Sequence, residues 1–402
     1  MFSLDRFYNI LHNNLISQLN GKSIYFHPFG TYQNAMLIDG SYDPMLVNSL
    51  KQNWDPTTTF VHTYFFDQEP LYNHTASIVT KTVSQLYFLE GPNKIEIFAN
   101  SEKSDSKTQI ITSGKLQDWY YFFHGFAALD WYRNFQYVNP SSFNRFDKVF
   151  ICYNHLTSNL RSYRLHLVSN LIAQGLNKHG LISLFHNGWE NTIVDPNNPL
   201  DNRARVTIYN VLKNIKDPLT IDTNIPTGAL SASINLEDST SALFHIVTET
   251  IYFDPKLHLT EKIFKPIVAK RPFILVAAPG NLAYLKSYGF RTFDYWIDES
   301  YDLETDHYIR IEKITAEIAR LCAMDPAELK QMHQEMQTVL EYNFNHFYGK
   351  FKNIIVDELV DNFEHIFCQI NNGRQPGNHS RYHQRFELDT AYLEQVKKRL
   401  KQ

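Results

Sequence analysis

Short apolar runs that suit buried strands recur along the chain, and segments with helical spacing separate them. The alternation predicts an α/β protein with mostly parallel sheets, because parallel strands need crossover connections that are usually helical. Strands buried on both faces show continuous apolar runs instead of strict alternation. The runs are residues 23–28, 59–66, 94–99, 148–154, 180–185, 243–249 and 271–278.

The chain has 402 residues, which exceeds the size at which a single hydrophobic core usually stops growing. A polar, turn-rich connection at 137–147 separates an aromatic-rich first half from a more regular second half. We therefore expect one Rossmann-like domain over residues 1–145 and another over 146–345. The remaining segment, 346–402, is expected to be helical with a basic tail and to pack back on the first domain.

Charge and composition limit the classes of function. The net charge of −4 lacks the basic excess of a protein that wraps nucleic acid. The three cysteines are too few and too scattered for a disulfide framework or a thiolate zinc site, which favours a reducing compartment. No apolar run reaches the roughly 18 residues of a membrane span, and the N-terminus lacks the apolar block of a signal peptide. The expected location is cytoplasmic.

Two helices can be predicted from spacing and capping signals. Residues 160–176 place Leu165, Val168 and Leu171 on one face directly after a predicted strand. Residues 324–344 begin with Asp325 as an N-cap and Pro326 at the first helical position. Each pattern is typical of an amphipathic helix that covers a sheet.

The stretch LTEKIFKPIVAKRPFIL, residues 259–275, joins a helix start to a predicted strand. Thr260 is a good N-cap, and Lys262 and Lys265 place positive charge at the same helix end. Free N–H groups and positive charge together suit a phosphate, whereas Glu261 suits the hydroxyl groups of a sugar. A nucleotide satisfies both groups; the alternative is an ordinary capped helix with solvated lysines.

Residues 247–275 resemble the donor-binding motif of the α-1,3-fucosyltransferases and related GT-B glycosyltransferases. The shared pattern is a strand that ends in a glutamate, a loop, and Thr-Glu-Lys opening a helix before the next strand. The resemblance implies that Glu261 contacts ribose, that Lys262 contacts the diphosphate and that Glu249 faces the donor sugar. Thr250 stands where the family usually has Asn, so the resemblance does not identify the sugar.

The family also uses an arginine from the first helix of the donor domain as a second phosphate ligand. Arg161 and Arg164 follow the strand at 148–154, where a guanidinium can bind a diphosphate with two parallel hydrogen bonds. The resemblance implies that one of them does so. The alternative is that both are ordinary surface arginines.

Sugar transfer with inversion needs a base for the acceptor hydroxyl. The apolar run at 59–66 is followed by Asp67 and Glu69, and a carboxylate at the end of such a strand faces the crevice of an open α/β sheet. The base of fucosyltransferases has a comparable position, and we prefer Glu69 to Asp67. The alternative is a solvated acidic turn.

An aromatic segment and an acidic segment are further candidates for a site. His124 lies beside a glycine in the aromatic segment 118–133 and is a candidate for substrate contact. The acidic segment at 298–302, with Asp298, Glu299 and Asp302, lacks the spacing of a calcium loop and predicts a capped turn before a helix. The three cysteines form no Cys-x-x-Cys pair, and no protein metal site is expected.

The resemblance, together with these patterns, implies an inverting, metal-independent GT-B glycosyltransferase with two Rossmann-like domains facing across a cleft. The donor is expected to be a GDP-sugar or a UDP-sugar, with no other cofactor, and the acceptor a glycan. One alternative acceptor is a modified nucleic acid base, favoured by the basic tail after Gly373. The other alternative is a catalytically idle GT-B module that binds sugars.

Overall fold

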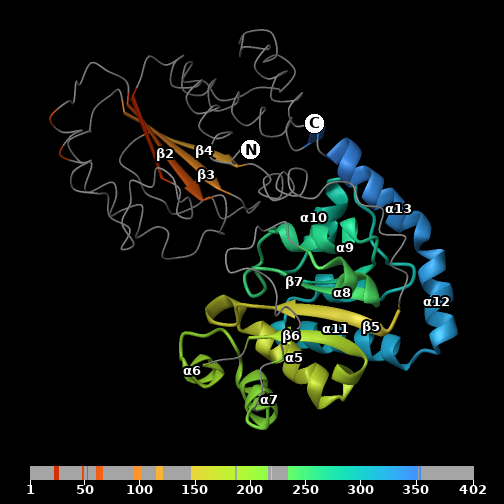
Figure 1. Cartoon of the computed structure of the whole chain (residues 1–402). Helices are drawn as coiled ribbons and strands as arrows, with labels where there is room; N and C mark the ends of the chain where they lie inside the picture. Colours follow the sequence, from red (N-terminus) through yellow and green to blue (C-terminus); the bar gives the residue numbers. More distant parts are fainter. Residues whose placement is uncertain are drawn as a thin grey trace. The chain divides into compact units, whose positions relative to one another are not determined.

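The computed structural model describes the second half of the chain in detail and four strands of the first half (Figure 1). The described ranges are 22–26, 60–66, 94–100, 115–120, 146–185, 188–215, 234–351 and the single positions 48, 52, 219, 353 and 354. The chain divides into two compact units. One contains residues 1–126 and 355–402, and the other contains residues 127–354.

The first unit contains a parallel sheet of four described strands in the order β1-β2-β3-β4. The strands are β1 (Lys22–Phe26), β2 (Phe60–Phe66), β3 (Lys94–Asn100) and β4 (Lys115–Tyr120). Phe60 pairs with Lys94, and the register continues to Phe66 and Asn100. The first three strands match predicted runs. β4 was missed, because its sequence KLQDWY contains too few apolar residues to stand out.

The second unit contains a parallel sheet with the strand order β6-β5-β7-β8. The strands are β5 (Lys148–Asn154), β6 (Gly180–Leu184), β7 (Ala242–Thr248) and β8 (Phe273–Val276). Every residue of β7 is buried, as expected for a central strand covered on both faces. The predicted fold class, α/β with parallel sheets, is confirmed.

The strand order reverses between β5 and β7. From β5 the chain proceeds to β6 on one side, and from β7 it proceeds to β8 on the other. In open α/β sheets, ligands bind outside the carboxyl ends of the strands at such a switch point. The loops after β5 and β7 are therefore the first place to look for a site.

Helices cover both faces of this sheet. Helix α5 (Tyr163–Ala173) packs against β6, α7 (Asn202–Leu212) and α11 (His307–Ala323) (Figure 1). The other helices are α6 (Trp189–Val194), α8 (Leu236–Ser241), α9 (Phe264–Val268), α10 (Asn281–Ser287), α12 (Pro326–Glu335) and α13 (Gln337–His346). The short helices are η3 (Asn159–Arg161), η4 (Leu176–Lys178), η5 (Glu261–Ile263), η6 (Glu299–Leu303) and η7 (Phe347–Phe351).

Both predicted helices are present. The first is divided into η3 and α5, and Leu165, Val168 and Leu171 are buried as expected. The second is divided into α12 and α13 at Met336, whose backbone keeps helical angles. Asp325 caps α12 by accepting a hydrogen bond from the Ala327 N–H.

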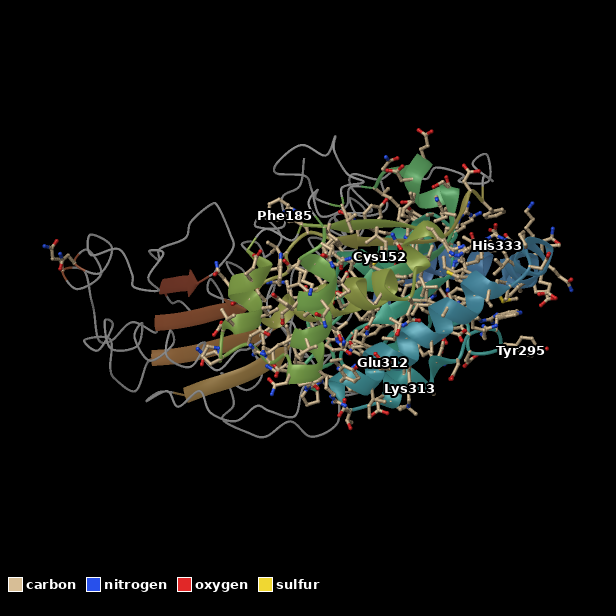
Figure 2. The ribbon with its side chains drawn as sticks, turned by 90° about the horizontal axis from the view of Figure 1, so that it is seen from below. Cys152, Phe185, Tyr295, Glu312, Lys313 and His333 are labelled. Atoms are coloured by element: carbon tan, nitrogen blue, oxygen red, sulfur yellow. The ribbon has the colours of Figure 1, made fainter. Side chains whose placement is uncertain are left out.

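The described cysteines are free thiols within the second unit. Cys152 is buried in β5, and burial raises the pKa of its thiol to about 12 (Figure 2). Burial also raises the pKa of Cys322 in α11 to about 11. Neither thiol is therefore a reactive thiolate at neutral pH. Among the described residues, no helix has the length and apolar character needed to cross a membrane.

Candidate functional site

The end of β7 is joined to the start of η5 by a buried carboxylate. Glu249 follows β7 directly and is 0% exposed. Its Oε1 accepts a hydrogen bond from the Thr260 N–H at 3.1 Å, and its Oε2 accepts one from the Thr260 hydroxyl at 2.6 Å. The strand end thus fixes the position of a turn that lies eleven residues later in the sequence.

Thr260 in turn fixes the position of Lys262. The threonine hydroxyl accepts hydrogen bonds from the Lys262 N–H at 3.4 Å and from Lys262 Nζ at 2.9 Å, which confirms the predicted N-cap. Lys262 Nζ also lies 3.1 Å from Glu261 Oε1. The side chains of Lys262 and Glu261 are 28% and 23% exposed, so both reach the surface. The third N–H of the Lys262 ammonium has no partner among the described residues and can bind a ligand.

The two carboxyl groups differ in their electrostatic environment. Burial raises the pKa of Glu249, although Lys262 and the hydrogen bonds from Thr260 oppose this effect. Burial also favours a raised pKa for Glu261, but the positive charges of Lys262 and Lys265 outweigh it and lower the pKa. Glu261 is therefore an ionised acceptor at the surface, whereas Glu249 is an internal support.

Arg164 is a structural anchor. Its side chain lies inside the protein, with 3% of the residue exposed. Nη2 donates to the carbonyl oxygens of Thr248 and Glu249 at 3.0 Å each, and Nη1 donates to the Leu156 carbonyl at 2.8 Å. These bonds hold together the loops that follow β5 and β7, and they occupy most of the donors that a diphosphate would need.

Arg161 and Lys265 lie at the same end of the sheet. Arg161 is half-buried at the end of η3, in the connection from β5 to α5. Lys265 is half-buried on α9, and its Nζ lies 5.7 Å from the centre of the Tyr153 ring on β5. Both cations therefore lie in the segments that connect β5 to β6 and β7 to β8.

The structure brings part of the predicted site into one network. Glu249, Thr260, Glu261 and Lys262 form a continuous chain of hydrogen bonds, and Arg164 joins it through the Glu249 carbonyl. Glu249 was expected to face the donor sugar. In the structure it is buried, and both of its carboxylate oxygens accept hydrogen bonds from Thr260. Three predicted residues, Asp67, Glu69 and His124, lie outside the described residues.

The acidic segment forms the capped turn that the sequence predicts. Asp298 accepts a hydrogen bond from the Ser300 N–H and caps η6. Glu299 accepts from the Thr292 hydroxyl and the Phe293 N–H, whereas Asp302 accepts from the Leu282 N–H. Each carboxylate thus holds a different piece of backbone, and no cluster of metal-ligating residues was found in the described part of the chain.

Sequence reasoning missed three residues at this edge. The Tyr163 hydroxyl donates a hydrogen bond to the Glu249 carbonyl, so Tyr163 supports the same loop as Arg164. Phe185, just after β6, is 47% exposed, and its ring lies 5.9 Å from that of His155, just after β5. The sequence signal that could have identified Phe185 is an aromatic residue at the end of the apolar run 180–185.

Comparisons with protein-family models and with curated proteins gave no match. Distant similarity to solved structures was found. A mutant of T4 phage BGT in complex with UDP-glucose has a TM-score of 0.38 and 10% identity, covering 87% of this chain and 85% of that chain. The α,α-trehalose 6-phosphate synthase of Burkholderia multivorans has a TM-score of 0.33 and 10% identity, covering 94% and 79%. The structure described as OtsA apo has a TM-score of 0.34 and 12% identity, covering 89% and 78%.

Proposed function

We propose that the chain is a GT-B glycosyltransferase that moves a sugar from a nucleoside diphosphate-sugar to an acceptor hydroxyl. The observation that carries this proposal is the hydrogen-bonded chain from Glu249 through Thr260 to Lys262. It places an exposed ammonium at the carboxyl end of a parallel sheet, beside the point where the strand order reverses. The resemblance of residues 247–275 to fucosyltransferases assigns a diphosphate to the same position.

Lys262 and Arg161 bind the diphosphate in this proposal. Lys262 contributes an ammonium whose direction is set by Thr260. Between the two arginines we prefer Arg161, because the guanidinium of Arg164 is bonded to three carbonyl oxygens. Arg164 and Glu249 are positioning residues, which hold the two loops at the distance that the donor requires. Lys265 adds positive charge from α9.

The ribose and the base extend from the diphosphate along the same edge. Glu261 is ionised and partly exposed, so it can accept hydrogen bonds from ribose hydroxyls. The exposed ring of Phe185, with His155 beside it, provides a surface for base stacking. Base stacking does not distinguish guanine from uracil, and the donor is either a GDP-sugar or a UDP-sugar.

The proposed reaction is a single displacement with inversion. The acceptor oxygen attacks the anomeric carbon while the bond from that carbon to the diphosphate oxygen breaks, and Glu69 takes the acceptor proton. Lys262 and Arg161 stabilise the negative charge of the leaving diphosphate, so the proposal needs no metal ion. A glycan hydroxyl is the proposed acceptor. Turnover by Glu69→Gln, compared with Asp67→Asn, tests which carboxylate is the base.

Thermal unfolding with a panel of UDP, GDP and their sugar conjugates tests the donor site. A ligand that binds only the folded state raises the melting temperature in proportion to the logarithm of its concentration over its Kd. We expect one diphosphate to stabilise the chain and Lys262→Ala to lose most of that shift. Lys286→Ala is the matched control, because this lysine is ion-paired at the surface with Asp294. No shift with any nucleotide, or an equal shift in both variants, contradicts the proposal.

A further inference from the structure

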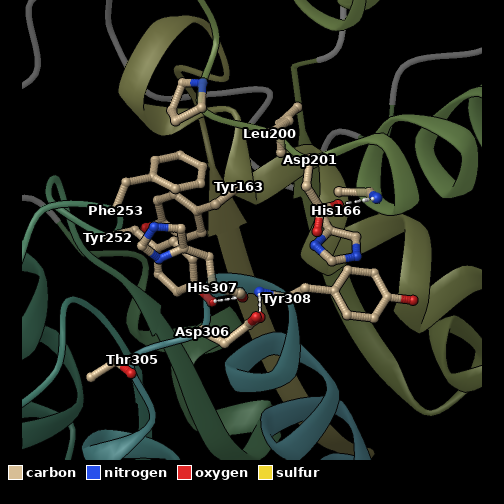
Figure 3. Close-up of a pocket in the computed structure, with 12 residues that line it drawn as sticks. Tyr163, His166, Leu200, Asp201, Tyr252, Phe253, Thr305, Asp306, His307 and Tyr308 are labelled. Atoms are coloured by element: carbon tan, nitrogen blue, oxygen red, sulfur yellow. Dashed lines mark hydrogen bonds between the residues drawn. The ribbon is translucent and has the colours of Figure 1, made fainter.

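A cavity of about 340 Å³ lies in the same unit as the proposed donor site (Figure 3). It is formed by the starts of α5, α7 and α11 together with the loop after β7. Arg161, Glu261 and Lys262 do not line it. Ligand pockets begin at about 300 Å³, so this cavity has room for a small molecule.

One wall consists of three aromatic rings that pack against one another. The Tyr252 ring is stacked on Tyr163 at 4.3 Å, and the Arg310 guanidinium lies 4.1 Å from its centre. Phe253 meets both tyrosines edge to face. This wall therefore gives the cavity a rigid apolar surface.

The opposite wall repeats the arrangement. The His166 ring is stacked on Tyr308 at 5.0 Å, and the Arg203 guanidinium lies 4.1 Å from the centre of the Tyr308 ring. Figure 3 shows His166, Tyr308 and Asp201 across the cavity from Tyr163, Tyr252 and Phe253. Both walls are held rigid by these stacks, so the cavity is preformed.

Two histidines supply N–H donors. Asn170 Nδ2 donates to Glu312 and contacts His166 Nε2 at 3.3 Å, so Nε2 accepts and the proton of the neutral ring is on Nδ1. Arg310 can only donate, so His307 Nδ1 accepts at 3.2 Å and the ring proton is on Nε2. Neither of these ring N–H groups has a partner among the described residues, although His166 is only 3% exposed.

Two carboxylates supply acceptors and determine which charges are tolerated. Asp201 caps α7, and Arg203 donates to it at 2.8 and 3.0 Å. Asp306 caps α11 by accepting from the N–H groups of Tyr308 and Ile309. The carboxylates occupy both helix starts and would repel a phosphate.

We propose that this cavity binds a neutral sugar ring, with the imidazole N–H groups and the two carboxylates as partners of its hydroxyls. Apolar ring surface for the carbon skeleton, with donors and acceptors for the hydroxyl groups, is what such a ligand requires. The site is separate from the proposed donor site and stands whether or not the chain transfers sugars. The Tyr163 hydroxyl bonded to the Glu249 carbonyl joins the two sites through one side chain.

Saturation-transfer NMR on the full chain tests the proposal, with methyl β-glucoside, methyl β-galactoside and methyl α-mannoside as probes. We expect at least one probe to bind and glucose 6-phosphate to bind more weakly than methyl β-glucoside. Maltose and cellobiose separate two sources of the same chemistry: tighter binding indicates the end of a glycan, and no gain indicates a free small sugar. Binding of none of the probes overturns the proposal, as does a preference for the phosphate.

Variants locate the bound sugar. His307→Phe keeps the ring and removes its N–H, whereas Asp306→Asn keeps the cap and removes the carboxylate. Each is expected to weaken binding about tenfold, the value of one hydrogen bond. Asp298→Asn is the matched control at a cap outside the cavity. Lys262→Ala should lose nucleotide binding and keep sugar binding, which separates failure here from failure of the proposed function. Unchanged binding in both cavity variants overturns the proposal.

Discussion

Three helix starts in one unit are capped in two different ways. At η5 the cap is Thr260, a neutral residue, and Lys262 beside it carries a positive charge toward the surface. At α7 and α11 the caps are Asp201 and Asp306, which place negative charge on the first turn. The difference teaches that cap chemistry determines ligand charge: one start remains available to a phosphate, whereas the other two suit neutral hydroxyls.

The largest expected effect is a difference in acid response between the two regions. Burial lowers the pKa of His166, in the cavity wall, to about 4, that of His245 to about 3 and that of His333 to about 4. Burial shifts the pKa of Glu249 in the opposite direction and raises it. Acid therefore costs stability at the histidines and none at Glu249.

The sign for the histidines follows from the unfolded state, where their pKa is 6.5. Between pH 6.5 and about 4 the unfolded chain binds protons that the folded rings do not bind, so stability is lost as the pH falls. We expect a loss of about 3 kcal/mol for each histidine over this pH range, measured by urea denaturation. His166→Gln should reduce the pH dependence, and an unchanged slope in this variant would contradict the assignment.

The next effect concerns the buried carboxylate at the turn. Glu249→Ala leaves the N–H and hydroxyl of Thr260 without their acceptor inside the protein, at an expected cost of about 3 kcal/mol in the free energy of unfolding. Diphosphate binding should fall with it, because Lys262 loses its support. Glu261→Ala is the comparison: its carboxylate is partly exposed, so stability should change little. Equal losses in the two variants would refute the supporting role of Glu249.

A smaller effect isolates the threonine hydroxyl. Thr260→Val keeps the shape and removes the hydrogen bonds to Glu249 and Lys262, for an expected cost of about 1 to 2 kcal/mol in unfolding free energy. Thr260→Ser keeps the hydroxyl and should retain nucleotide binding. Calorimetric titration with the diphosphate that stabilises the wild type compares the two. If the Thr260→Val variant binds the diphosphate as tightly as the Thr260→Ser variant, the hydroxyl does not position Lys262.

Local patterns predicted much of this sheet and part of its site. The runs at 148–154, 180–185 and 243–249 became β5, β6 and β7 because apolar strands covered on both faces are visible in sequence. Thr260 was found as a cap because capping depends on neighbouring residues. The burial of Glu249 could not be predicted, since its partner Thr260 is reached only when the loop between them folds.

The cavity was also not predictable from local sequence patterns, because its residues are far apart in the chain. Tyr163, Tyr252 and His307 come from three separate parts of the chain and meet only through the packing of α5 and α11. Arg164 was expected to bind phosphate because a guanidinium near a strand end suits that role. Its bonds to the Thr248 and Glu249 carbonyls depend on the distance between β5 and β7, which spacing does not reveal.

The smallest expected effect tests whether a neutral cap alone creates a phosphate site. Asp306→Asn makes the start of α11 resemble that of η5 in charge, and asparagine caps as well as aspartate. The loss of a favourable charge at an exposed helix start costs about 0.5 kcal/mol in unfolding free energy. Nucleotide affinity should stay unchanged, because no lysine corresponds to Lys262 in the first turn of α11. A gain of diphosphate binding at this variant, measured in Lys262→Ala to silence the first site, would mean that the neutral cap is sufficient and that the lysine is not the deciding charge.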